Sequence, residues 1–143
     1  MKIKISEATG KVLDYLVAKA LGYKFGHWQI NNASYINVWA ELVDAAGCGP
    51  AGYFPEDDRF RFSTDWAQGG PIIEREKIGV LPDDRHRFSQ WRAFCWHPSQ
   101  HDLTFEDATS HMEAGSTLLI AAMRCFVASR LGDEVDVPEE LLQ

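Results

Sequence analysis

Apolar residues near the start of the chain first alternate with polar ones and then recur at helical spacing. The alternation from Lys2 to Ile5 predicts a short strand with one buried face. From Ala8 to Leu21 apolar residues return every three or four positions, after a candidate N-cap at Ser6 and before Gly22. This spacing predicts an amphipathic helix over about residues 7–21, whose apolar stripe packs against another element.

A second long helix is predicted near the C-terminal end of the sequence. Ser116 or Thr117 can cap it, and Gly132 can end it. The segment between them is apolar on nearly every side, and a helix of that kind belongs in the centre of a fold. We therefore predict a buried helix over residues 116–131.

The segments that follow the first helix carry weaker periodic signals. Tyr23 to Ile30 is rich in aromatic and β-branched residues, which favours a strand. From Tyr35 to Ala46 apolar residues return at helical spacing after Asn32 or Ser34 as a cap, which predicts another helix. The glycines and the proline between Cys48 and Gly52 then predict a turn.

The centre of the chain, from Phe62 to Ile78, concentrates cap, turn and helix-start signals around Trp66. A single helical turn is predicted there, between a cap and a pair of glycines. The candidate caps are Ser63, Thr64 and Asp65, and the glycines are Gly69 and Gly70. Pro71 then suits the first turn of a new short helix that ends at Gly79, because a proline there loses no hydrogen bond.

Arg87 to Trp96 is the best strand candidate in the chain, because it has two distinct faces. One face would carry Arg87, Ser89, Trp91, Ala93 and Cys95, and the other Phe88, Gln90, Arg92, Phe94 and Trp96. The polar stretch from Thr104 to Gly115 is interpreted as a helical turn capped by Thr104.

These elements predict an α+β fold, in which two long helices, about 7–21 and 116–131, and shorter helices pack on a small antiparallel sheet. The 143 residues suit a single domain, 1–143. The longest wholly apolar run, Leu118 to Met123, is far short of the ~20 residues that a membrane helix needs, and no secretory leader opens the sequence. The three cysteines form no CxxC pair, so buried free thiols are expected.

The formal charge of −7 is unevenly distributed along the chain. Residues 101–143 contain nine carboxylates and two arginines, whereas residues 59–97 contain seven basic and five acidic side chains. The segment from Arg59 to Trp96 interleaves arginines with aromatic residues, which is the composition of a single-stranded nucleic-acid platform. The overall acidity opposes phosphate binding, so core aromatics are the preferred interpretation.

The segments Phe62–Ile78 and Leu118–Gly132 together resemble the NinX-like proteins of phages and prophages, over roughly Ser63 to Leu141. The resemblance implies an accessory protein of a phage or prophage. Together with the missing catalytic signatures, it favours a protein that binds a host or phage macromolecule without catalysis. The short apolar runs and the missing leader predict a place in the cytoplasm of the host bacterial cell. The matching positions, which form the candidate ligand or partner site, are Ser63, Thr64, Asp65, Trp66, Gly70, Pro71 and Arg124.

A hydrolase or a nucleic-acid-processing enzyme is the competing hypothesis. Asp65 and Glu74, with His97, would supply the paired carboxylates and the acid–base group that such chemistry needs. Capping by Asp65 and a favourable helix-dipole interaction of Glu74 are the structural alternatives. No phosphate-binding glycine loop, serine elbow or dinucleotide fingerprint is present, so we expect neither catalytic residues nor a cofactor.

Three further residue sets have candidate chemistry. Cys95, His97 and His101 have spacing that a metal ion could use, but Pro98 disrupts the strand and no fourth ligand is defined, so no metal is expected. Cys125 with His111 would make a thiol nucleophile, but burial in an apolar helix favours an inert thiol. Arg124 in that helix is expected to form a buried structural pair, with an anionic ligand as the alternative.

Overall fold

A computed structural model describes six stretches of the chain, residues 1–30, 33–39, 50–54, 60–84, 90–95 and 112–142. Their α-helices are α1 (Gly10–Ala20), α2 (Trp66–Glu76) and α4 (Leu118–Leu131). The strands form three small antiparallel sheets, which confirms the α+β class but divides the expected single sheet into three. None of these helices is both long and apolar enough to span a membrane.

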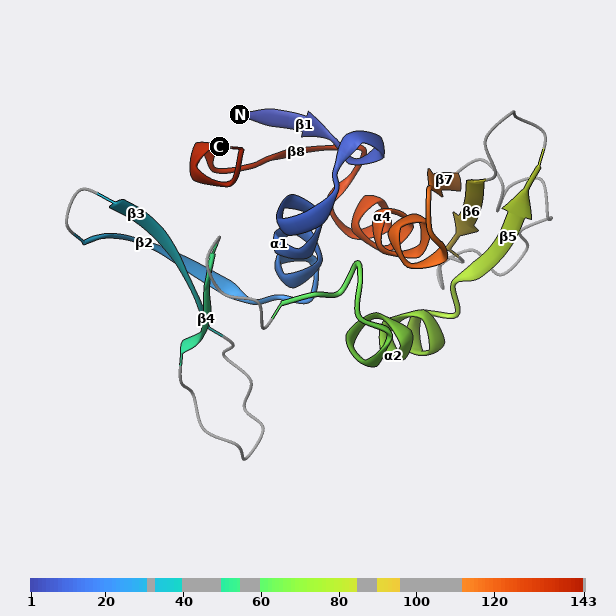
Figure 1. Ribbon diagram of the computed structural model, residues 1–143, viewed down its shortest axis with the longest axis horizontal. Coiled ribbons are helices and arrows are strands. Elements are labelled where there is room, and N and C mark those ends of the chain that lie inside the picture. Colours follow the sequence, from blue (N-terminus) through green and yellow to red (C-terminus); the bar gives the residue numbers. More distant parts are fainter. Residues whose placement is uncertain (31–32, 40–49, 55–59, 85–89, 96–111, 143) are drawn as a thin grey trace.

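The smallest sheet joins two segments from opposite ends of the sequence. Strand β1 (Lys2–Lys4) runs antiparallel to β8 (Glu134–Asp136), with Ile3 opposite Val135 (Figure 1). The strand predicted from Lys2 to Ile5 is thereby confirmed as β1, although Ile5 already belongs to the 3-10 helix η1 (Ile5–Glu7). A second 3-10 helix, η2 (Glu139–Leu141), follows β8.

Helix α1 begins later than its apolar pattern predicted. The N-cap is Thr9 rather than Ser6, because Ile5–Glu7 forms η1 and the Ala8 N–H donates to the Ile5 carbonyl at 3.0 Å. The predicted stripe is nevertheless buried, and Leu13, Leu16 and Val17 belong to the hydrophobic core.

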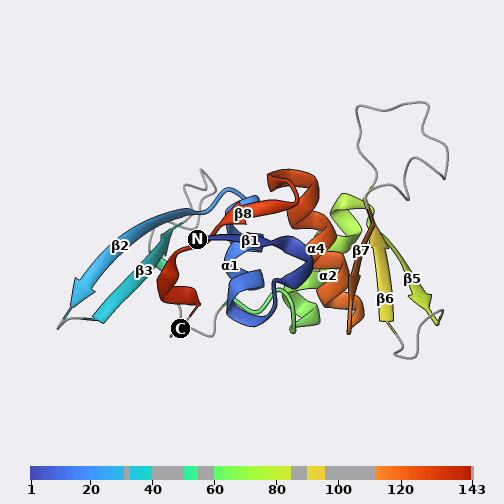
Figure 2. The ribbon, with the colours of Figure 1, turned by 90° about the horizontal axis from the view of Figure 1, so that it is seen from above.

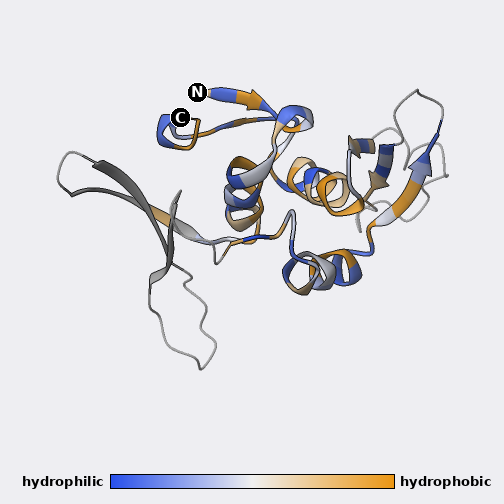
Figure 3. Ribbon diagram, in the orientation of Figure 1, coloured by the Kyte–Doolittle hydropathy of each residue, from blue (hydrophilic) through white to orange (hydrophobic). Residues whose placement is uncertain are grey.

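Helix α4 lies at the centre of the fold, as its apolar sequence predicted. The Thr117 hydroxyl accepts the Ile120 N–H at 3.2 Å, which confirms one of the two predicted caps. Most of its residues are buried, and the ribbon of α4 is hydrophobic over much of its length (Figure 3). Helix α4 packs against α1, α2 and the sheet that contains β6, so all of these elements contact the same helix.

That sheet has the order β5 (Gly79–Asp83), β6 (Gln90–Phe94), β7 (Met112–Gly115). The strand predicted from Arg87 to Trp96 is confirmed over Gln90–Phe94, and its remaining residues lie outside the described part of the chain, apart from Cys95, which follows the strand. Ala93 is buried against the core, and Trp91 and Cys95 on the same face are partly buried there.

The helical turn predicted between Thr104 and Gly115 is wrong where it can be compared. Met112–Gly115 is strand β7, paired with β6, and residues 104–111 lie outside the described residues. A local cap signal carries no information about the pairing with β6 that makes this segment extended.

The helix predicted from Tyr35 to Ala46 is wrong over Tyr35–Trp39, the part of it that the structure describes. Strands β2 (Lys24–Ile30) and β3 (Ala33–Trp39) form an antiparallel pair, and β4 (Pro50–Phe54) continues the sheet from β3. The segment Tyr35–Trp39 contains aromatic and β-branched residues, which favour pairing with a strand such as β2. In a short apolar run, the spacing of apolar residues does not distinguish a helix from a strand. The predicted turn from Cys48 is replaced by β4 over Pro50–Gly52, whereas residues 40–49 lie outside the description.

Helix α2 is one continuous helix rather than a turn followed by a second helix. Pro71 lies inside it, and Gly69 and Gly70 do not interrupt it. A proline crowds the Cβ and N–H of the residue before it when that residue is helical. Glycine at position 70 has no Cβ, which reduces this crowding. The helix ends at Glu76, and its C-cap Lys77 has a left-handed φ of 53°.

The helices lie between two of the sheets. In both Figure 1 and Figure 2, the β2–β3 hairpin extends from one end of the molecule, and β5, β6 and β7 lie at the other end beyond α4. Helix α2 therefore lies close to the β5–β6–β7 end, packed on α4.

Candidate functional site

Most of the predicted site residues surround the beginning of α2. Asp65 is the N-cap of this helix, and its Oδ1 accepts the Ala67 N–H at 2.9 Å. The turn before it is closed by the Asp65 N–H, which donates to the Arg61 carbonyl at 2.7 Å. The capping role that the sequence proposed for Asp65 is thus confirmed.

Replacing Asp65 with alanine is expected to destabilise the protein by about 1 kcal/mol, because α2 loses its cap hydrogen bond. Asp65→Asn keeps an oxygen acceptor and should stay within about 0.5 kcal/mol of the native protein. Urea unfolding followed by circular dichroism measures both values. If both variants were equally destabilised, the loss would come from the negative charge rather than from the cap.

Ser63 attaches this turn to α1. Its side chain is 1% exposed, and its N–H donates to Asp14 Oδ1 at 2.8 Å. Burial raises the pKa of the Asp14 carboxyl, although the hydrogen bond from the Ser63 N–H and the nearby charge of Lys11 act in the opposite direction. Ser63 therefore holds the turn in place, whereas the neighbouring Thr64 is exposed.

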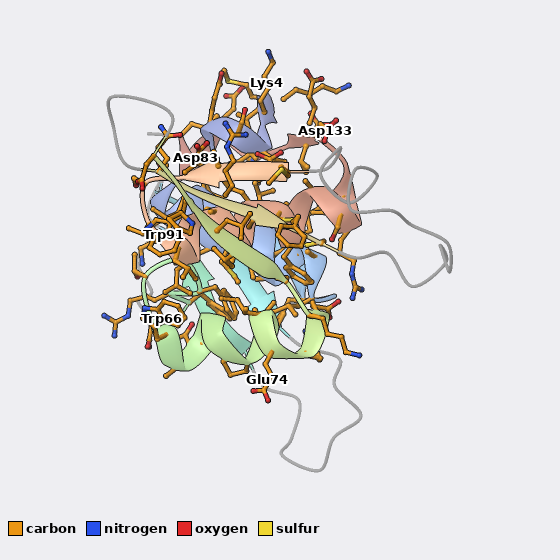
Figure 4. All side chains as sticks on the ribbon, turned by 90° about the vertical axis from the view of Figure 1, so that its right-hand side faces the viewer. Lys4, Trp66, Glu74, Asp83, Trp91 and Asp133 are labelled. Carbon is orange, nitrogen blue, oxygen red and sulfur yellow. The ribbon has the colours of Figure 1, made fainter. Side chains whose placement is uncertain are left out.

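An apolar face is left open on the first turns of α2. Trp66 is 56% exposed, and a Cβ built on Gly70 would meet Trp66 Cε3 at an ordinary 3.8 Å. Ala67 and Pro71 are also exposed on the adjoining helix positions. We call Trp66, Ala67, Gly70 and Pro71 the Trp66 face. Figure 4 shows Trp66 at one end of α2 and Glu74 at the other.

Arg124 is held by a different set of contacts. Its Nε donates to the Ala8 carbonyl at 2.9 Å, and its Nη1 donates to the Ala114 carbonyl at 2.7 Å. Burial lowers the pKa of the guanidinium, and the charge of Glu113 opposes that shift. The side chain therefore joins α4 to β7 and to the segment before α1. The buried structural role predicted for Arg124 is thus filled by backbone carbonyls as its partners.

The carboxylates proposed for catalysis are not brought together. Asp65 and Glu74 lie nine residues apart along α2, a separation of about 13 Å at the helical rise per residue. Asp65 is occupied as a cap, and Glu74 is exposed to solvent. His97 lies outside the described residues.

Several aromatics of the Arg59–Trp96 segment belong to the interior. Phe60 and Phe62 are buried in the core, and their rings lie 5.8 Å apart between centroids. Trp91 is half-buried against the same core. The Trp66 ring is therefore the one described aromatic side chain of this segment that is largely open to solvent.

A second feature, a cleft of about 610 Å³, lies where α4 ends, between that helix, β7 and the segments β1–η1 and β8. It is lined by Lys4, Ser6, Cys95, Met112, Glu113, Cys125, Ala128, Ser129, Gly132, Asp133 and Glu134. Figure 4 shows Lys4 and Asp133 at the opposite end of the view from Trp66 and Glu74. Burial, together with the charge of Asp133, raises the pKa of Glu113.

Two thiols meet in this cleft, and nothing in the sequence pattern connects them. Cys125 Sγ lies 2.9 Å from Cys95 Sγ, and no disulfide bond joins the two sulfurs. The residues are 30 positions apart, one in a helix and the other after a strand, so no spacing pattern could have identified the pair. His97, His101 and His111, the proposed partners of these cysteines, lie outside the described residues. In the part of the chain that is described, no three metal-ligating side chains gather at one point.

The model of the family described as Bacteriophage P22, NinX matches residues 4–130, which is most of the chain. A search of curated proteins finds no match. The matched residues include α1, α2 and nearly all of α4, and therefore both the Trp66 face and the thiol pair.

Proposed function

Because the chain belongs to the NinX family of bacteriophage P22, we propose that it is a phage accessory protein that binds a macromolecule of the phage or its host, in the host cytoplasm and without catalysis. The binding site in this proposal is the Trp66 face. The observation that carries it is the 56% exposure of Trp66, in a protein whose other described aromatic side chains are buried or half-buried.

An exposed tryptophan on a helix favours protein recognition. Tryptophan is enriched among the residues that dominate binding energy, because its large ring buries much apolar area at a small cost in side-chain entropy. The neighbours Ala67, Gly70 and Pro71 are small or rigid, so they add little further entropy cost on binding. A partner of matching chemistry would present an apolar pocket for the indole and polar groups around it.

The two competing functions receive less support. A hydrolase would need the carboxylates of Asp65 and Glu74 at one reacting centre. Their positions along α2 hold the two carboxylates too far apart to act on the same bond. A single-stranded nucleic-acid platform would need several exposed rings for stacked bases, whereas Phe60 and Phe62 are core residues.

The test compares Trp66→Ala with Leu142→Ala, which removes another exposed apolar side chain from a site beyond η2. Each tagged protein is used to capture partners from cells that carry the phage, and the recovered proteins are quantified by mass spectrometry. We expect at least one protein to be recovered equally by the native chain and Leu142→Ala, and about tenfold less by Trp66→Ala.

Both variants should unfold within a few degrees of the native protein, because both side chains are exposed. Recovery of the same proteins in the same amounts by Trp66→Ala would reject the Trp66 face as the binding site. An absence of any protein enriched over a tag-only control would reject the binding function itself.

A further inference from the structure

The cleft beside α4 holds two thiols that partner binding at the Trp66 face does not use. Cys95 follows strand β6 and is partly exposed, whereas Cys125 is buried within α4. Their sulfur atoms are 2.9 Å apart, and a disulfide bond is about 2.05 Å long. The two sulfurs are therefore within about 1 Å of bonding distance.

The two thiols are chemically unequal. Cys125 donates its S–H to the Cys95 sulfur, and this hydrogen bond lowers the pKa of Cys95, with a further contribution from Ser129. Burial of Cys95 and the charge of Glu76 act against the shift. The same hydrogen bond, together with burial, raises the pKa of Cys125. Cys95 is thus the sulfur that loses its proton more readily, and Cys125 is the one that holds its proton more firmly.

The surroundings of Cys95 include two more charged groups that offset each other. Glu76 accepts a hydrogen bond from Arg130 at 2.9 Å, and this exposed pair lies near enough to influence the Cys95 thiol. The cleft gives a small reactant access to the sulfur, since its lining includes Cys95, Cys125 and Ser129 and its volume is about 610 Å³. At the Cys95 sulfur, access for a small reactant therefore coincides with a nearby proton donor and a second sulfur.

We propose that Cys95 and Cys125 form a hydroperoxide-reactive thiol pair that closes reversibly to a disulfide. The Cys95 thiolate attacks the outer oxygen of a hydroperoxide and the O–O bond breaks, so that Cys95 becomes a sulfenic acid and the leaving oxygen takes a proton from water to form an alcohol or water. Cys125 then attacks the sulfenic sulfur, its proton leaves with the hydroxyl as water, and the two cysteines share a disulfide bond. Two molecules of a low-molecular-weight thiol then reduce this bond by exchange, which restores both cysteine thiols and oxidises the small thiol to its own disulfide.

The disulfide would fasten the end of β6 to the middle of α4 and so close a long loop that contains β7. Closing a loop of this length restricts the unfolded chain, and an increase in melting temperature of roughly 5–10 °C is expected. The proposal does not depend on the Trp66 face, because the two sites share no residue.

The test treats the reduced full-length protein with hydrogen peroxide, blocks the remaining thiols and maps the peptides without reduction. We expect a Cys95–Cys125 linkage that a thiol reductant removes, together with the increase in melting temperature. A disulfide that instead contains Cys48, or a protein whose three thiols all survive a peroxide dose that oxidises free cysteine, would overturn the proposal.

Two variants separate the roles of the sulfurs. In Cys125→Ala, Cys95 should accumulate as a sulfenic acid that a cyclic diketone traps, because the second sulfur is missing. In Cys95→Ser, trapping at Cys125 should be at least about tenfold slower, because that thiol keeps its proton. Equal trapping at both positions would contradict the assigned order of attack. The peptide map of the native protein decides the linkage independently of whether either variant folds.

Discussion

Replacing Gly69 with alanine is expected to destabilise the protein by about 2–3 kcal/mol, because the new methyl group has no space. A Cβ at this position would lie 2.5 Å from the Phe62 carbonyl oxygen and 2.6 Å from Leu119 Cδ2. The first of these neighbours is backbone and cannot turn away. The clash would therefore push α2 away from α4 and from the turn that precedes α2. Urea unfolding measures the change in stability.

Gly70→Ala is the matched control, since it adds the same methyl group one residue further along α2. Among the described residues, its Cβ would meet Trp66 Cε3, at an ordinary contact distance of 3.8 Å. Alanine gains about 1 kcal/mol of helix propensity over glycine, but crowding by Pro71 offsets part of that gain. The Gly70→Ala protein should stay within about 1 kcal/mol of the native one. Equal losses at both positions would mean that neither glycine is required by close packing.

The second prediction concerns Arg124. Arg124→Met keeps much of the apolar length of the side chain but removes both hydrogen bonds, to the Ala8 and Ala114 carbonyls. We expect a loss of about 2–4 kcal/mol, because hydrogen bonds from a charged donor are strong and the freed carbonyls are left without this partner. Glu113 also loses a positive charge that lowers its pKa, so that pKa should rise further.

Arg130→Met is the control on the same helix. Arg130 pairs with Glu76 at 2.9 Å, but its side chain is 49% exposed, and surface ion pairs contribute about 0–1 kcal/mol. The free energy of unfolding, measured by thermal and urea denaturation, should therefore fall clearly more in Arg124→Met than in Arg130→Met. A loss at Arg124 as small as that at Arg130 would show that its carbonyl contacts are not structural, and would revive the hypothesis that it holds an anionic ligand.

The sequence predicted the elements whose signals are local and long. Helix α4 was recognised because a segment that is apolar on all sides must be buried, and Asp65 was recognised as a cap because its side chain acts within its own turn. The prediction of an apolar stripe on α1 is confirmed, but the predicted first residue of the helix is wrong. Ser6 is an equally good cap by composition, and only the formation of η1 by residues 5–7 moves the helix start to Gly10.

The errors lie where distant pairing or packing decides the structure. Strand β5 contains Gly79 and Pro82, which are poor strand formers, and it is extended because it pairs with β6. Gly69 was interpreted as a helix stop, whereas its lack of a side chain serves the approach of α2 to Leu119 and Phe62. The two thiols lie in segments that are far apart in the sequence, and only the fold brings their sulfur atoms together.

The pairing of β1 with β8 has a consequence for synthesis of the protein in the cell. Ile3 leaves the ribosome before its partner Val135, which is added more than a hundred residues later. A contact of such sequence separation can form only after both strands have left the ribosome. Until then Lys2–Lys4 lacks the strand that it pairs with, so a nascent chain should keep this segment accessible to chaperones.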